Sequence, residues 1–140
     1  MFLAPVDEIE VQGIIRKLKN KRTSGPDGIP DFLVKECGKE LLTPLTHIIN
    51  CSFETGIFPE RLKVARIKPI FKNGAKTDKN NYRPIALLSI FSKIIETAVA
   101  KRLTNFCDKY KIIKTEQHGF VKSKNTGTAL LQFAQGIIRD

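Results

Sequence analysis

The amino-acid sequence predicts an α+β chain that is rich in helices and contains one small antiparallel β-hairpin. Apolar residues recur at helical spacing in several stretches, and two short β-branched stretches flank one polar loop. The 140 residues are 41% hydrophobic and include nine Phe, so they can bury a core. Because no internal repeat or flexible linker divides them, we expect one domain or part of one.

The first helix is predicted to begin directly after Asp7. Asp7 and Glu10 have the spacing of a capping box, in which two side chains satisfy free backbone N–H groups at a helix start. The apolar residues that follow at helical spacing are Val11, Ile14, Ile15 and Leu18. This pattern predicts a helix with one apolar face.

Residues 24–30, with the sequence Ser-Gly-Pro-Asp-Gly-Ile-Pro, predict a turn. Two Gly, two Pro and one Asp within seven residues interrupt any regular element. We interpret Gly25 and Gly28 as turn formers rather than ligand contacts. We interpret the Asp27 carboxylate as an acceptor within the turn rather than a metal ligand.

Two further helices are predicted before residue 60. A short one covers residues 31–37 and is expected to end at Gly38. A longer one covers residues 40–55, tolerates Pro44 in its first turn and is closed by Gly56.

The second half of the chain predicts two more helices around a loop. Ser89 is the expected N-cap of a long helix. Its buried face is predicted to carry Phe91, Ile94, Ile95, Ala98, Leu103 and Phe106. Residues 111–125 are predicted to be mostly loop. The last helix, from about Thr126, carries Leu130, Phe133, Ala134, Ile137 and Ile138 at helical spacing.

The hairpin is predicted from residues 64–72 and 82–87. The first stretch is short, β-branched and basic, the second is a further short strand, and the polar loop 73–81 joins them. Pro69 is expected at a sheet edge or a bend, because proline cannot donate to a ladder. The loop is longer than ordinary hairpin connections.

The net charge of +10 is unevenly distributed along the chain. Residues 1–60 hold seven basic and nine acidic side chains, a balance of −2, whereas residues 61–140 hold 17 and 5, a balance of +12. This asymmetry favours a basic surface that binds polyanions, with nucleic acid the usual partner. A basic protein without such a partner remains an alternative on charge alone.

Several classes of protein and site are disfavoured by composition. No apolar run is long enough for a membrane span, and the start MFLAPVDEIE lacks the features of a secretory signal. The cysteines, Cys37, Cys51 and Cys107, are scattered and odd in number, which argues against a disulfide framework. With only two histidines, a structural zinc site is not expected. We therefore expect an intracellular location, in the cytoplasm or nucleus.

Four segments together carry a family resemblance. They are residues 24–30; residues 56–59 leading into 65–74; residues 81–89 with 93–96; and residues 117–120 with Thr126 downstream. Their order and spacing, over about residues 9–138, resemble the reverse transcriptase domain of LINE-type (non-LTR) retrotransposons. Each segment alone is a weak signal, whereas the ordered set is specific.

The resemblance implies a right-hand polymerase fold, of which this chain would be the N-terminal fingers portion, truncated before the catalytic palm. Residues 1–60 would form a helical N-terminal extension, residues 61–88 the basic fingers hairpin, and residues 89–140 the helices leading into the palm. The implied function is a fragment of an RNA-directed DNA polymerase, a nucleotidyltransferase. A non-catalytic basic nucleic-acid-binding module derived from such an element is the alternative, and an unrelated helical interaction domain is a third possibility.

The resemblance also implies functional residues. Lys72 and Arg83 match positions that contact the triphosphate of the incoming nucleotide. Gln117, Gly119 and Phe120 match the motif that shapes the template–primer and nucleotide pocket. Without the motifs, Lys72 and Arg83 could be ordinary solvated charges, Gln117 a loop residue bonded to local backbone, and Phe120 part of the core.

Small departures affect the template contacts. Many family members have Arg directly after the Gly-Phe pair, but Val121 stands here, so Lys122 or Lys124 must supply any charge. Asn125 with Thr126 replaces a common Ser-Thr pair.

The metal-binding carboxylates of the family are the main departure. The intact enzyme is expected to use Mg²⁺ held by a strand Asp and a later Asp-Asp pair, with an RNA template, a DNA primer and dNTP as partners. This chain contains no Asp-Asp pair, and no β-rich run leads into Asp140. We therefore expect no catalytic or metal-binding residue, no activity of this chain alone, weak non-specific binding of nucleic acid, and an exposed apolar patch where fingers would pack on palm.

Overall fold

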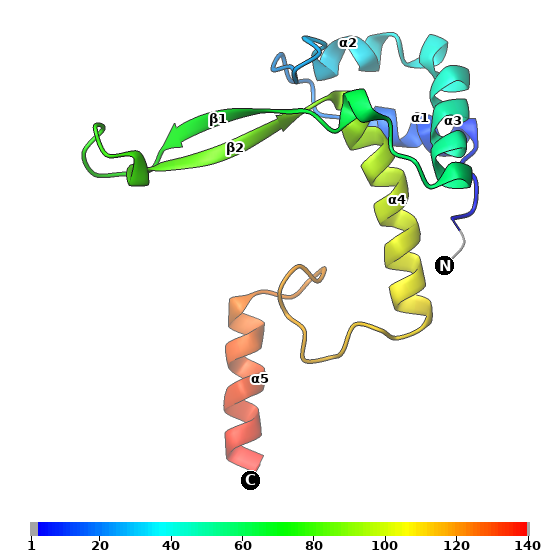
Figure 1. Cartoon of the computed structure of the whole chain (residues 1–140). Coiled ribbons are helices and arrows are strands. Elements are labelled where there is room, and N and C mark those ends of the chain that lie inside the picture. Colours follow the sequence, from blue (N-terminus) through cyan, green and yellow to red (C-terminus); the bar gives the residue numbers. More distant parts are fainter. Residues whose placement is uncertain (1–2, 140) are drawn as a thin grey trace. The chain divides into compact units, whose positions relative to one another are not determined.

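The structure, a computed structural model, describes the backbone of residues 3–139 and the side chains of residues 3–137 (Figure 1). It has the helices α1 (Glu8–Arg16), α2 (Asp31–Glu36), α3 (Gly38–Thr55), α4 (Ile90–Lys109) and α5 (Thr126–Arg139), and the strands β1 (Ala65–Phe71) and β2 (Tyr82–Leu88). Short 3-10 turns lie at Glu60–Leu62 and Lys79–Asn81. The helix-rich α+β class with one antiparallel hairpin is as predicted. The chain divides within α4 into a first unit, Met1–Arg102, and a second unit, Leu103–Asp140.

The core of the first unit lies between α1, α3 and the first half of α4. Val11, Ile49 and Ile94 are completely buried, and they come from these three helices. The other buried apolar residues are Val6, Ile14, Ile15, Val34, Leu45, Ile90, Ile95 and Ala98. The hairpin extends away from this helical body (Figure 1), so its side chains are largely exposed.

The predicted turn at residues 24–30 packs against the junction of β2 and α4. Gly28 has a φ of +73°, which glycine adopts without strain. Asp27 Oδ1 accepts a hydrogen bond from the Ile29 N–H at 3.1 Å, as expected of a turn acceptor. A Cβ on Gly25 would lie 2.6 Å from the Leu88 carbonyl oxygen, so only glycine permits this close approach.

Ser89 joins this turn to α4. Its Oγ accepts a hydrogen bond from the Phe91 N–H at 3.1 Å, which confirms it as the N-cap. The same hydroxyl donates to Asp27 Oδ2 at 2.5 Å, and Ser89 is only 3% exposed. One buried side chain therefore fixes the start of α4 and the turn together.

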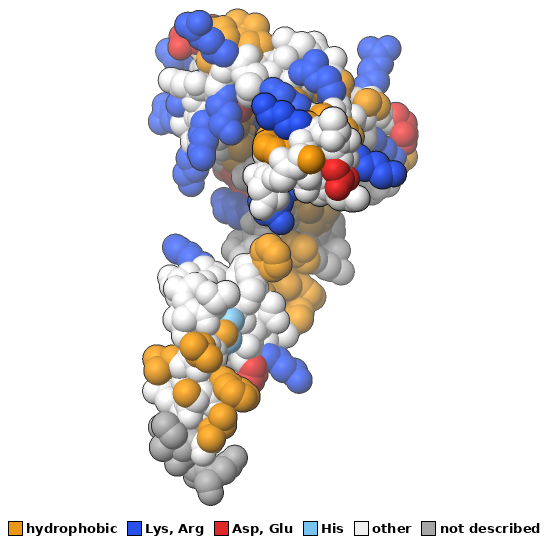
Figure 2. All heavy atoms as spheres, turned by 90° about the vertical axis from the view of Figure 1, so that its left-hand side faces the viewer, with side chains coloured by type: hydrophobic (Ala, Val, Ile, Leu, Met, Phe, Trp, Pro, Cys, Tyr) orange, Lys and Arg blue, Asp and Glu red, His pale blue; other side chains and the backbone are white. Residues whose placement is uncertain are grey.

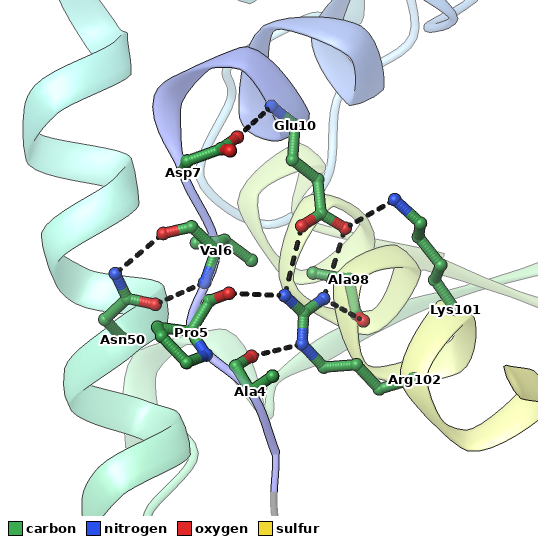
Figure 3. A network of polar contacts seen from close by, with 9 residues as sticks. All are labelled: Ala4, Pro5, Val6, Asp7, Glu10, Asn50, Ala98, Lys101 and Arg102. Atoms are coloured by element: carbon green, nitrogen blue, oxygen red, sulfur yellow. Dashed lines mark hydrogen bonds and ion pairs between the residues drawn. The ribbon is translucent and has the colours of Figure 1, made fainter. Parts of the chain in front are cut away.

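Only half of the predicted capping box forms at the start of α1. Asp7 Oδ1 accepts from the Glu10 N–H at 2.7 Å, as predicted. The Glu10 carboxylate instead binds the Arg102 guanidinium, with oxygen–nitrogen distances of 3.0 and 3.1 Å (Figure 3). The reciprocal bond was a wrong prediction because a charged partner on α4 offers the carboxylate two stronger, charge-assisted bonds.

Arg102 is the centre of a wider network in the first unit. Its guanidinium also donates to the carbonyl oxygens of Ala4, Pro5 and Ala98, and Lys101 Nζ lies 3.0 Å from Glu10 Oε1 (Figure 3). The network thereby ties the segment before α1 to α4.

Two predicted helix details are corrected by the structure. Gly38 does not end the short helix; it is the first residue of α3, so Pro44 lies inside the helix rather than in its first turn. Leu103 was predicted on the buried face of α4 but is 50% exposed. Ala98 is the last buried residue of α4, so the apolar spacing continues past the core.

The second unit exposes an apolar face of α5. Leu130, Phe133 and Ile137 are 68%, 68% and 63% exposed, whereas Ala134 is half-buried. Hydrophobic side chains are visible along this helix in Figure 2. The Ile138 side chain and Asp140 lie outside the described residues. This exposed face agrees with the apolar patch predicted from the sequence.

No helix in the described part of the chain combines the length and apolar character required to cross a membrane.

The Glu10–Arg102 pair gives the first prediction, which concerns stability. The Arg102 hydrogen bonds, helped by Lys101 and opposed by burial, lower the pKa of the Glu10 carboxyl from its ordinary value of 4.5. Stabilisation by a depressed carboxyl pKa is present above the ordinary value and is lost as pH falls below it. Replacing Glu10 with Gln should therefore lower the free energy of unfolding at pH 7 by about 1–2 kcal/mol.

Urea denaturation at neutral and acidic pH measures this effect. The difference between the original chain and Glu10→Gln should shrink below the ordinary carboxyl pKa. Glu96→Gln is the matched control, because Glu96 is an exposed carboxylate of α4. A pH-independent difference would contradict the assignment.

Candidate nucleotide and nucleic-acid interface

The two strands form an antiparallel ribbon in which two prolines face each other. Pro69 lies opposite Pro84. Neither has an N–H, so this must be a pair without ladder bonds, and the pairs on either side must be hydrogen-bonded. The Lys72 N–H donates to the Asn81 carbonyl at 2.7 Å, which continues the same alternation beyond the strands. Each strand is an edge strand, as predicted for Pro69.

This register places Lys72 and Arg83 on one face. Side chains alternate between the faces of a strand, and cross-strand partners share a face. Arg83 pairs with Ile70, two residues before Lys72, so Lys72 and Arg83 are diagonal neighbours. We call this face the basic face; on the strands it carries Arg66, Lys68, Ile70, Arg83, Ile85 and Leu87, and Lys72 continues it directly after β1.

The opposite face carries no charged side chain on the strands. We call it the apolar face; it carries Ala65, Ile67, Pro69, Phe71, Tyr82, Pro84, Ala86 and Leu88. Phe71 and Tyr82 are cross-strand partners whose rings meet edge to face, with centroids 5.5 Å apart. The ribbon is therefore amphipathic.

Positive charge dominates around the ribbon. Between residues 65 and 88 the sequence has six basic side chains and one acidic one, Asp78. Lys72 and Arg83 are exposed, and within the described residues neither forms an ion pair. An anion that approaches the basic face would therefore meet cations not already neutralised by carboxylates.

Hydrogen bonds organise the loop that joins the strands. The Tyr82 hydroxyl donates to the Lys76 carbonyl at 2.9 Å, and Asn81 Nδ2 donates to the Ala75 carbonyl at 2.9 Å. Asp78 Oδ1 accepts from the Asn80 N–H at 2.9 Å. At the other end of the ribbon, the Arg66 guanidinium donates to the Ser24 carbonyl at 2.9 Å. Both ends of the ribbon are thus held by specific contacts.

The second candidate group, around residues 117–120, lies in the second unit. Gln117 Nε2 donates to the Gly119 carbonyl at 2.9 Å, which is the local backbone bond left open as an alternative. Phe120 has a φ of +60° and is fully exposed, so it is not a core residue in the described structure. A Cβ on Gly119 would meet no atom closer than 3.7 Å, so nothing within the described chain requires glycine there.

His118 was not predicted from the sequence, yet it anchors this loop to α5. Its Nδ1 lies 2.9 Å from Thr128 Oγ1, and its Nε2 lies 2.7 Å from Gln132 Oε1. Asn125 and Thr128 form reciprocal side-chain-to-backbone bonds of 3.0 and 2.9 Å at the start of α5. Their three-residue spacing ahead of an apolar run is the sequence signal that would have identified this helix start.

The two lysines predicted as template contacts differ in their surroundings. Lys122 is exposed. Lys124 Nζ donates a hydrogen bond to the Thr115 carbonyl, so its ammonium group is engaged within its own loop. These lysines and the 117–120 group belong to the second unit, whereas Lys72 and Arg83 belong to the first.

In the described part of the chain, no cluster of three or more His, Cys, Asp or Glu side chains could hold a metal ion. The acidic side chains of the described residues therefore do not fit a catalytic centre with two magnesium ions.

The chain is similar to polymerases of mobile elements. It is 30% identical over 126 residues to the "Probable RNA-directed DNA polymerase from transposon BS" of Drosophila melanogaster. The aligned region covers 87% of this chain and 14% of that protein. It is 34% identical over 119 residues to the "RNA-directed DNA polymerase from mobile element jockey" of the same species, covering 84% and 13%.

A third relative agrees with these two. The "Probable RNA-directed DNA polymerase from transposon X-element" of Drosophila melanogaster is 28% identical over 121 residues, which is 86% of this chain and 13% of that protein. No family model matches the chain. The three relatives are homologous to most of this chain. The chain spans only 13–14% of the length of these curated relatives.

The second prediction concerns the anchor at His118. Replacing His118 with Ala removes both contacts to α5, so hydrogen exchange of the backbone amides in residues 117–125 should quicken about five- to tenfold. Gln135→Ala, an exposed change on the same helix, is the control and should leave these amides unchanged. Equal exchange in the original chain and the His118 variant would show that the anchor does not order the loop.

Proposed function

We propose that this chain is the fingers portion of a reverse transcriptase domain of a non-LTR retrotransposon. Its role would be to bind the incoming nucleotide and the template. The observation that carries this proposal is the placement of Lys72 and Arg83 as diagonal neighbours on one face of the ribbon, in a homologue of RNA-directed DNA polymerases.

The chemistry of the two side chains suits a triphosphate. Arginine has a planar fork that can bind two phosphate oxygens, while lysine provides a compact charge on a flexible stem. Diagonal neighbours on an antiparallel pair lie about 7–8 Å apart, so Lys72 and Arg83 can contact different phosphate groups of one ligand. Their exposure leaves both available.

The base of the ribbon is fixed while its tip extends outward. The Arg66 bond to Ser24 and the close contact of Gly25 with Leu88 hold the base against the first unit. Bending of the ribbon would bring the basic face over a bound nucleotide. Such closure excludes water and strengthens the interaction of these cations with the phosphates.

The 117–120 group would form a pocket of its own within the second unit. Phe120 combines full exposure with a backbone conformation that costs energy for a side chain other than glycine. A ring held outward in this way is available to a sugar or base. Gln117 and Gly119 would shape the same pocket, and Lys122 is the better candidate for a phosphate contact, because Lys124 is engaged by Thr115.

Catalysis itself would depend on other parts of the polymerase. Nucleotidyl transfer uses carboxylates that hold magnesium ions, and the described residues do not provide such a cluster. In this proposal Mg²⁺, the RNA template and the DNA primer are bound by the intact enzyme in the nucleus or cytoplasm. A second candidate is a non-catalytic nucleic-acid-binding module, which the balance of +12 in residues 61–140 favours.

The third prediction tests the triphosphate site. The double change Lys72→Gln and Arg83→Gln should weaken deoxynucleoside triphosphate binding at least about tenfold, because two charge-assisted contacts are lost. Titrations followed by NMR of the ribbon amides would measure the affinity. The control, Lys17→Gln with Lys39→Gln, removes the same charge from exposed helix ends of the first unit. Equal weakening in both doubles would reject a specific site.

The fourth prediction concerns activity. The 140-residue chain should show no magnesium-dependent primer extension on an RNA template, because it lacks a clustered carboxylate site among its described residues. Incorporation of labelled nucleotide would be compared with a heat-denatured sample. Template-dependent incorporation above that background would show that this chain supplies catalytic groups.

A further inference from the structure

The apolar face of the ribbon is not covered by the first unit. Ile67 is 59% exposed and Phe71 is 38% exposed. Pro84 and Ala86 on the second strand are also exposed. This face points away from the one that holds Lys72 and Arg83, so the proposed triphosphate site leaves it unused.

The loop between the strands turns this face into a hollow near the tip. The Tyr82 hydroxyl bond to the Lys76 carbonyl draws the loop over the end of the strands. An open, shallow cavity of about 460 Å³ lies here. Its lining residues are Pro69, Lys76, Thr77, Lys79, Tyr82 and Pro84. The cavity is therefore lined by two prolines and a tyrosine from the strands, and by two lysines from the loop.

This combination matches the chemistry of a nucleic-acid strand. Aromatic rings stack on bases of any sequence, and nearby lysines attract the phosphates. Phe71 supports the Tyr82 ring by its edge-to-face contact. Asp78, the only acidic residue of the ribbon, has its carboxylate engaged by the Asn80 N–H. Figure 2 looks onto the tip of the ribbon and shows hydrophobic side chains there among Lys and Arg.

We propose that the tip of the apolar face is a second contact site, which binds a single-stranded segment of RNA or DNA. A base would stack on Tyr82 beside Pro69, and the adjoining phosphates would bind Lys76 and Lys79. The choice of nucleic acid as occupant rests on the proposed function and on the positive charge around the cavity, which favours a polyanion over an apolar protein segment or a second copy of this chain.

The composition of the chain provides a direct reporter. It has two tyrosines and no tryptophan, so Tyr110→Phe leaves Tyr82 as the only strong emitter. In this background a single-stranded oligonucleotide of about ten nucleotides should quench Tyr82 emission, because stacking places a base against the ring. The quenching should saturate with the dissociation constant obtained from anisotropy of a labelled oligonucleotide. RNA and DNA versions would identify the preferred strand.

Three variants test the two loop lysines and the Tyr82 ring. Lys76→Gln with Lys79→Gln should weaken binding about tenfold at low salt and reduce the slope of log K against log[salt] by about 1.4. The equally charged control, Lys17→Gln with Lys39→Gln, should have a smaller effect. Tyr82→Phe retains the ring but loses the hydroxyl bond to the Lys76 carbonyl, so it should lose clearly less affinity than Tyr82→Ala, which should lose about tenfold.

Three outcomes would overturn the proposal. Saturating binding without a change in Tyr82 emission would place the strand elsewhere. Equal losses in the two lysine doubles would reduce the interaction to general charge. Concentration-dependent quenching without oligonucleotide would identify a second copy as the occupant. Lys72→Gln with Arg83→Gln separates the two sites, because it should reduce triphosphate binding while leaving the quenching intact.

Discussion

The contact between the 24–30 turn and the junction of β2 with α4 is the constraint on which the ribbon depends. Gly25 lies so close to the Leu88 carbonyl that any side chain would force the two segments apart. The buried Ser89 hydroxyl caps α4 and donates to Asp27, so the turn, the second strand and the helix are fixed at one point. Leaving this buried hydroxyl without hydrogen-bond partners would lower the free energy of unfolding by about 1–3 kcal/mol. The two bonds therefore favour this one arrangement of turn and helix over alternatives.

The two opposed prolines disfavour a shift of the ribbon by one residue. Pro69 and Pro84 can face one another only in a pair that lacks ladder bonds. A slip of one residue would move each side chain of a strand to the other face, so Lys72 and Arg83 would no longer lie together. The separation into a basic face and an apolar face therefore follows from where the prolines stand, and both proposed contact sites depend on it.

Local sequence patterns predicted the elements well, because helix spacing, turn residues and β-branched runs act over a few positions. The turn roles of Gly28 and Asp27 and the capping role of Ser89 were all confirmed. The predictions that were wrong concern contacts between residues far apart in the sequence. Arg102 lies 92 residues from Glu10 and takes over its carboxylate, and apolar spacing cannot tell that Leu103 lies beyond the core. The roles implied for Lys72 and Arg83 remain predictions.

The second unit leaves the apolar face of α5 largely exposed. An isolated helix of 14 residues is marginal in water, and α5 exposes Leu130, Phe133 and Ile137 along one face. The His118 contacts and the Asn125–Thr128 cap stabilise its first turns but bury little apolar surface. Its stability should therefore depend on a further apolar surface. In the proposed polymerase the palm would provide it, and covering α5 would also fix the loop that presents Phe120.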